Sequence, residues 1–177
     1  MMLKPKLQRE EKNSVKASKI SFLALSMALA MILSFIESQI PAFVAVPGVK
    51  VGLTNIVIVF LLYKVGAKEA GAVSLIRVVL VGLLFGSLVS ILYSLAGAVL
   101  SFCGMVLLKK TGWFSTMAVS VTGAVLHNVG QVLMACFVTE TAQLIYYLPV
   151  LMVSGVIAGI VVGIAGALMI QRVPTQF

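Results

Sequence analysis

Residues 20–36 have the sequence ISFLALSMALAMILSFI, an apolar run of 17 residues without a charged side chain. A helix that crosses the hydrocarbon core of a bilayer needs about 20 mainly apolar residues, with a range of about 17–25. The run is longer than the apolar part of a cleaved signal peptide, which has about 7–15 residues. No A-x-A cleavage site follows, since the next residues are Glu37-Ser38-Gln39-Ile40-Pro41. We therefore predict a retained first membrane span over residues 20–37.

The composition of the whole chain agrees with a membrane location. Hydrophobic residues make up 61% of the 177 residues and charged residues 10%, against about 45–50% and about 25% in an average soluble domain. So few charged side chains cannot cover the outside of a soluble fold of this size. The sequence predicts an all-α, polytopic membrane protein embedded in a lipid bilayer.

Polar residues, prolines and glycines divide the chain into six predicted transmembrane helices. They cover residues 20–37, 51–63, 69–85, 88–108, 113–138 and 143–171. The second span is short unless residues 46–50 extend it, and only Gly86-Ser87 marks the bend between the third and the fourth. We expect a single transmembrane domain at 20–172, a basic N-terminal tail at 1–19 and a short C-terminal tail at 173–177.

The positive residues predict the orientation of these spans. Eleven of the 13 cations fall on one side: Lys4, Lys6, Arg9, Lys12, Lys16, Lys19, Lys64, Lys68, Lys109, Lys110 and Arg172. Lys50 lies on the opposite side and Arg77 within a span. Because Lys and Arg gather in cytoplasmic loops, we expect both termini in the cytoplasm and the protein in the plasma membrane. No aromatic residue is interleaved with the lysines of the tail, which argues against a nucleic-acid partner.

The long outer loop, residues 38–50, is too apolar for a simple solvated connection. Two interpretations remain open. The loop rests in the headgroup region, or it forms a lid over an outward-facing cavity.

Polar side chains within the spans identify a candidate binding site. They are Asn55, Arg77, His127, Asn128 and Gln131, with Glu37 and Lys50 at the outer boundary. A charged side chain at the centre of a membrane helix costs about 2.5–3.5 kcal/mol on insertion scales, so these groups should face protein or water. His127 and Gln131, four residues apart, share a helix face. We therefore predict a cationic pocket near mid-membrane, in which Arg77 binds an anionic group.

A structural role for the same residues is the alternative. Interhelical hydrogen bonds in membrane proteins contribute about 0.6 kcal/mol each on average. Glu37 or Glu69 would make Arg77 structural by neutralising it.

Small residues mark two predicted packing faces. Gly155, Gly159 and Gly163 recur at helix-packing spacing and should pack inside the monomer. Ala24 and Ala28, on a helix with little polar character, are candidates to face a partner subunit. Cys103 and Cys136 have no CxxC or Cys/His cluster around them, and we interpret both as packing residues.

Several chemistries are excluded. The chain contains no aspartate, so it lacks the aspartate-rich clusters that hold magnesium in prenyl-diphosphate elongation, and it lacks a Ser/His/Asp arrangement. No G-x-x-x-x-G-K-[ST] phosphate loop is present. One histidine and two dispersed cysteines do not form a zinc or haem site. We predict no catalytic residue, no metal and no cofactor.

Several sequence elements together resemble a known family. They are Glu37-Ser38-Gln39-Ile40-Pro41, Pro47-Gly48-Val49-Lys50-Val51-Gly52-Leu53-Thr54-Asn55, Arg77 with Leu84-Phe85-Gly86, Gly123-Ala124-Val125-Leu126-His127-Asn128-Val129-Gly130-Gln131, and Tyr147-Leu148-Pro149. Over about residues 20–172 the chain resembles the Gx transporter family, which is often labelled heptaprenyl diphosphate synthase component I. That family is similar to the substrate-binding S components of energy-coupling factor (ECF) transporters.

The resemblance implies a six-helix bundle like that of the ECF S components, which captures a small molecule from outside and is driven by separate ATPases and a coupling membrane subunit. Ala24-Leu25-Ser26-Met27-Ala28 is similar to the A-x-x-x-A element with which S components dock the coupling subunit. Members of the family also resemble a membrane component associated with flavin-based extracellular electron transfer and demethylmenaquinone production. This implies a quinone-, prenyl- or flavin-related ligand.

A second hypothesis comes from a different class. The basic tail and the small-residue faces would serve a non-catalytic membrane scaffold that holds quinone-synthesis or electron-transfer proteins at the bilayer. Secondary transport by the chain alone fits less well, because the sequence shows no internal repeat and no intramembrane acid to carry a proton.

Overall fold

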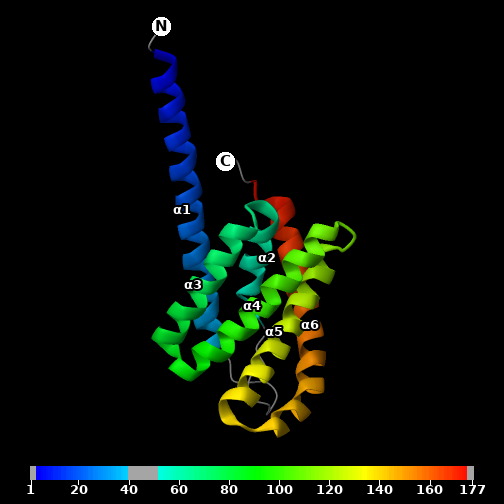
Figure 1. Cartoon of the computed structure of the whole chain (residues 1–177). Coiled ribbons are helices and arrows are strands. Elements are labelled where there is room, and N and C mark those ends of the chain that lie inside the picture. Colours follow the sequence, from blue (N-terminus) through cyan, green and yellow to red (C-terminus); the bar gives the residue numbers. More distant parts are fainter. Residues whose placement is uncertain (1–2, 40–51, 175–177) are drawn as a thin grey trace.

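The computed structural model describes residues 3–39 and 52–174, and every regular element among them is helical. Figure 1 shows the helices in one bundle. The elements are α1 (Leu3–Gln39), α2 (Asn55–Lys64), α3 (Ala67–Phe85), α4 (Leu88–Thr111), α5 (Thr116–Thr139), the 3₁₀ helix η1 (Ala142–Tyr147) and α6 (Leu148–Arg172). The all-α class is confirmed, and each predicted span overlaps one of these α-helices.

Four segments are long and apolar enough to cross a bilayer. They are Lys12–Gln39, Leu88–Thr111, Thr116–Thr139 and Ala142–Arg172. α3 has 19 residues but carries Lys68, Glu69 and Arg77. α2 has ten residues, about 15 Å of helix at 1.5 Å per residue, which is about half of a bilayer core. Four membrane-crossing helices are thus supported by length and composition, and six remain a prediction.

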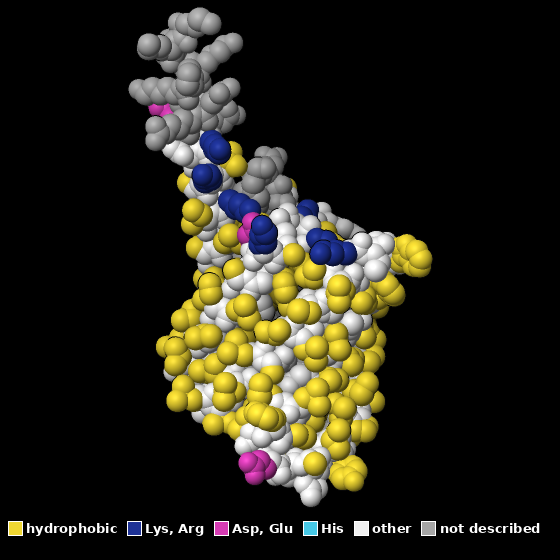
Figure 2. Space-filling model, in the orientation of Figure 1, with side chains coloured by type: hydrophobic (Ala, Val, Ile, Leu, Met, Phe, Trp, Pro, Cys, Tyr) yellow, Lys and Arg dark blue, Asp and Glu magenta, His cyan; other side chains and the backbone are white. Residues whose placement is uncertain are grey.

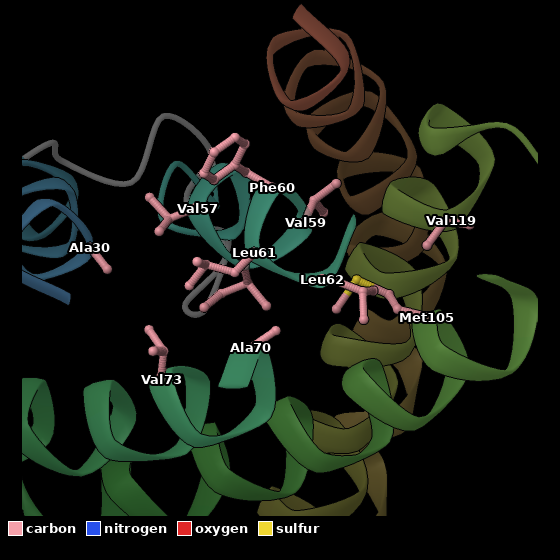
Figure 3. Close-up of a cluster of buried hydrophobic side chains, with 11 residues drawn as sticks. Ala30, Val57, Val59, Phe60, Leu61, Leu62, Ala70, Val73, Met105 and Val119 are labelled. Carbon is pink, nitrogen blue, oxygen red and sulfur yellow. The ribbon is translucent and has the colours of Figure 1, made fainter. Parts of the chain in front are cut away.

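The short helix α2 is the centre of the bundle. Six consecutive residues, Val57–Leu62, are buried, so that α2 has no polar face. A helix that is apolar all round is expected to be enclosed by protein. Figure 3 shows its side chains packed between those of α1, α3, α4 and α5. We call the set the apolar cluster; it comprises Ala30, Val57, Ile58, Val59, Phe60, Leu61, Leu62, Ala70, Val73, Met105 and Val119.

The bend between α3 and α4 falls at Gly86-Ser87, as predicted. The Ser87 side chain accepts a hydrogen bond from the Ser90 backbone N–H at 3.2 Å, and the Ser90 hydroxyl in turn accepts one from the Ser87 N–H at 3.0 Å. This reciprocal capping satisfies backbone donors that the first turn of α4 would otherwise leave unpaired.

The glycine stripe of α6 packs inside the monomer, as predicted. A Cβ placed on Gly159 would lie 2.5 Å from the Val121 Cα, and one on Gly163 would lie 2.7 Å from the Met117 Cα. Both neighbours belong to α5, so the absent side chains allow the two backbones to approach closely.

The packing role predicted for the cysteines is wrong for Cys103, whose side chain is exposed on α4, whereas Cys136 is half-buried. In an apolar helix a small thiol is tolerated on the outer face as well as inside, and the sequence pattern does not distinguish the two.

Both chain termini lie at the same end of the bundle, and α1 projects beyond it there (Figure 1). On the face in Figure 2, the Lys and Arg side chains gather at this end above a broad hydrophobic belt. We call it the basic end. It includes Lys64 at the end of α2, Lys68 at the start of α3 and Lys109 at the end of α4. The distribution agrees with the predicted orientation, although the side of the membrane stays a prediction.

Residues 3–19 of the predicted tail are continuous in one helix with the first apolar run. Ala24 and Ala28 are exposed on this helix, as is Leu25 beside them. They are therefore accessible for the docking role predicted for them, which stays a prediction. The predicted lid is outside the described residues except for Ser38 and Gln39, the last two residues of α1.

Candidate functional site

One cavity of about 160 Å³ lies in the bundle, and all six α-helices contribute to its wall. Six of the seven predicted ligand-binding residues line it: Glu37, Asn55, Arg77, His127, Asn128 and Gln131. The seventh, Lys50, lies outside the described residues. We call this space the polar cavity. The C-terminal part of α1, the start of α2 and the half of α3 that precedes the Gly86-Ser87 bend form one part of its wall.

Arg77 is the cation of the polar cavity. Its Nη1 donates a hydrogen bond to the Ser34 hydroxyl at 3.2 Å, and this hydroxyl lies 2.8 Å from the hydroxyl of Thr54. The Nε–H of Arg77 is buried and has no hydrogen-bond partner among the described residues. A buried polar group without a partner costs about 1–3 kcal/mol and more when charged. The guanidinium therefore has unused capacity to bind an anion.

The carboxylates among the described residues make no ion pair with Arg77. Glu69, one of the two proposed counter-ions, forms an ion pair with Lys19. Glu37, the other, lines the same cavity as Arg77, but the described residues contain no ion pair between the two. Glu69 is therefore engaged elsewhere, whereas Glu37 attracts Arg77 across the cavity without a direct ion pair, and the structural alternative for Glu37 stays a prediction.

Glu37, which lines the polar cavity, also makes a structural hydrogen bond. Its Oε1 accepts a hydrogen bond from the backbone N–H of Gly52, which has a positive φ of 73°. Glycine adopts this left-handed conformation without a Cβ penalty. The contact ties the end of α1 to the turn that leads into α2, and so fixes the position of Asn55.

The polar face of α5 forms the opposite wall. The Asn128 Nδ2 donates to the carbonyl of Leu151 on α6 at 2.6 Å, so this residue joins two helices in addition to lining the cavity. His127 and Gln131 pack against Gly97 of α4, where an added Cβ would lie 3.1 Å from the His127 Cε1 and 2.9 Å from the Gln131 Cγ. The structural alternative predicted for these residues, an interhelical hydrogen bond, is therefore present at Asn128.

Sequence reasoning did not single out the hydroxyl residues of the cavity wall. They are Ser34, Ser38, Thr54, Ser90, Ser94 and Ser120. The spacing of two pairs was available as a signal, because Ser34 and Ser38, and Ser90 and Ser94, lie four residues apart and so share a helix face.

The arrangement fits ligand binding better than a reaction. Arg77 offers a positive charge, and amide and hydroxyl side chains line the same cavity, while the exposed surfaces of the helices are largely apolar. Within residues 3–39 and 52–174 no three His, Cys, Asp or Glu side chains group as metal ligands.

Comparison with known proteins gives the family. No curated protein and no solved structure matches the chain. The profile of one protein family, described as heptaprenyl diphosphate synthase component I, matches residues 26–169, a range that contains all of the polar cavity's described wall. The chain therefore belongs to the heptaprenyl diphosphate synthase component I family.

Proposed function

We propose that this chain is the substrate-binding subunit of a small-molecule transporter in the plasma membrane, built like an ECF S component. It takes up an anionic solute that is prenyl-, quinone- or flavin-related. Both termini face the cytoplasm, and an ECF coupling subunit with its ATPases drives transport. The role is non-catalytic: the family description names a synthase component, but the chain contains no aspartate with which to bind magnesium as prenyl elongation does.

The observation that carries the proposal is the buried, unpartnered Nε–H of Arg77, a residue in the wall of a cavity to which all six α-helices contribute. A charged side chain in a membrane helix is costly and usually marks a substrate or ion pathway. No acidic side chain among the described residues lies within ion-pair distance of Arg77, and Glu37 attracts it only across a longer distance. We infer that a bound anion supplies the direct counter-charge.

The proposed coupling surface is the outer face of α1. Ala24 and Ala28 are exposed there, in a helix that contacts the rest of the bundle mainly through α3. Small residues at a spacing of four permit close approach of a partner helix.

The test is mass spectrometry of small molecules released from protein purified gently from its native membranes, with copurifying subunits identified in the same sample. We expect wild type to release a stoichiometric ligand and Arg77→Ala to release none, while both unfold at similar temperatures. Arg172→Ala, at the exposed end of α6, is the matched control and should keep the ligand. Equal ligand content in Arg77→Ala and wild type contradicts the proposal.

The family description, which names a component of a heptaprenyl diphosphate synthase, favours a second candidate, a membrane scaffold for isoprenoid synthesis. The resemblance found in the sequence extends this candidate to demethylmenaquinone synthesis or flavin-based extracellular electron transfer. Its docking element is the basic start of α1, which projects past the bundle in Figure 1. Deletion of residues 1–18 should then release a prenyl-synthase or redox partner. If every partner stays bound and uptake fails, the scaffold hypothesis is wrong.

A further inference from the structure

The contacts of Arg77 leave one edge of its guanidinium for a ligand. Nη1 is engaged by Ser34, whereas the buried Nε–H has no partner among residues 3–39 and 52–174. The edge formed by Nε and Nη2 carries two parallel N–H groups. Such a fork matches the two oxygens of a carboxylate or two oxygens of a phosphate. Ser34 is thus a positioning residue, because its hydroxyl fixes which edge is left for the anion.

The charges of the polar cavity favour the carboxylate. Arg77 is the only Lys or Arg in the described part of the cavity wall, and Glu37 is present in the same wall. The charges of Arg77 and Glu37 cancel, so the charge of the ligand itself stays uncompensated. A carboxylate adds one negative charge, whereas a phosphate monoester adds about 1.5 to 2 at neutral pH. Burying uncompensated charge in an apolar bundle is costly.

The size of the cavity limits the rest of the ligand. Its volume is about 160 Å³. A cavity of about 150 Å³ holds one benzene molecule, and pockets for drug-sized ligands occupy about 300–1,000 Å³. A single ring with its substituents fits within this volume.

From these three observations we propose that the polar cavity binds a monocarboxylic acid of about one ring in size, with its carboxylate on the Nε–Nη2 edge of Arg77. This inference rests on the proposed function and narrows its ligand. Asn55 at the start of α2 and Gln131 on α5 also line the cavity and accommodate polar substituents on the ring.

The test uses calorimetric titration of the full-length protein in lipid nanodiscs with benzoate, benzamide and phenyl phosphate as probes. We expect benzoate to bind at least tenfold more tightly than the neutral benzamide or the dianionic phenyl phosphate. Arg77→Lys keeps the positive charge but lacks the fork, so the benzoate affinity should fall about ten- to hundredfold. Arg172→Lys is the matched control and should bind benzoate as wild type does.

Ser34→Ala provides a second variant in case Arg77→Lys does not fold. Loss of the hydroxyl frees Nη1 and should weaken benzoate binding about two- to tenfold, with little effect on the weak binding of benzamide. Equal benzoate affinity in wild type and the folded Arg77 or Ser34 variants overturns the carboxylate inference. So does tighter binding of phenyl phosphate than of benzoate.

Failure of this inference is distinguishable from failure of the proposed function. If wild type releases a native ligand that Arg77→Ala loses, but benzoate does not bind, the transporter proposal stands and the ligand class is wrong. If wild type releases no native ligand and binds none of the probes, both proposals are wrong.

Discussion

The two halves of the bundle use the same helices but are filled differently. Next to the basic end the helices close on the apolar cluster, and toward the opposite end they surround the polar cavity. On α1, Ala30 belongs to the cluster and Ser34, one turn further, to the cavity wall. On α3, Val73 belongs to the cluster and Arg77 to the wall.

The helices α2 and α5 divide in the same way. Val57 begins the clustered part of α2, two residues after the cavity-lining Asn55. On α5, Val119 packs in the cluster and the next residue, Ser120, lines the cavity. The apolar packing and the proposed binding site are therefore separated along each of these helices. The packed half holds the helices together, so the other half tolerates unpaired polar groups.

The largest effect should come from opening the packed half. Leu61 is 0% exposed, and Leu61→Ala should lower the free energy of unfolding by about 2–5 kcal/mol because it leaves a cavity at the centre of the bundle. Leu25→Ala is the matched control: Leu25 is 70% exposed on α1, and its truncation should change stability by less than about 0.5 kcal/mol.

Reversible unfolding in mixed detergent micelles measures both variants, and the native ligand content of each should stay at the wild-type value per folded protein. Equal losses of stability at the two leucines would show that the apolar cluster does not carry the fold.

A smaller effect should follow from separating α5 and α6, which border both halves. Gly159→Ala places a Cβ 2.5 Å from the Val121 Cα, a backbone atom that moves only with its helix. We expect a loss of about 1–3 kcal/mol in the free energy of unfolding. Gly71→Ala is the control, since its Cβ would lie 2.9 Å from the ring atom Cε1 of Phe102, a side chain that can rotate away.

The two glycine variants gain the same helix propensity from alanine, so their difference in unfolding free energy isolates the backbone contact. If Gly71→Ala is the more destabilising variant, the close α5–α6 contact does not limit stability.

The sequence predicted the positions of the helices better than their surroundings. The bend at Gly86-Ser87 was located correctly, because small capping residues interrupt an otherwise continuous apolar run. α2, which the sequence predicts as a membrane span, is a ten-residue helix enclosed by the bundle, and its crossing of the membrane stays a prediction. An apolar run is favourable against lipid and against protein alike, so periodicity alone does not separate the two.

Much of the cavity wall could also be predicted, for an energetic reason. Arg77, His127 and Gln131 are expensive in lipid, so the fold brings them to one enclosed space. The serines of the wall were missed because a hydroxyl in a membrane helix can bond the backbone of its own helix, as the Ser154 hydroxyl does with the Leu151 carbonyl at 2.9 Å. The contact of Ser34 with Arg77 joins residues 43 apart, and spacing along one helix carries no information about it.

The smallest effect should come from the basic end, outside both halves. Lys19 and Glu69 form the one ion pair found in the described part of the chain, and their side chains are 36% and 25% exposed. Because solvent and salt screen such a pair, Lys19→Met should lower the free energy of unfolding by less than about 1 kcal/mol, and the difference should shrink as salt is added.

Lys12→Met, an exposed position on the same helix, is the control and should leave stability unchanged. A salt-independent loss as large as that of Leu61→Ala would mean that the start of α3 is held to α1 by charge rather than by the apolar cluster. The basic end would then belong to the packed half, and the boundary between the two regions would shift toward the chain termini.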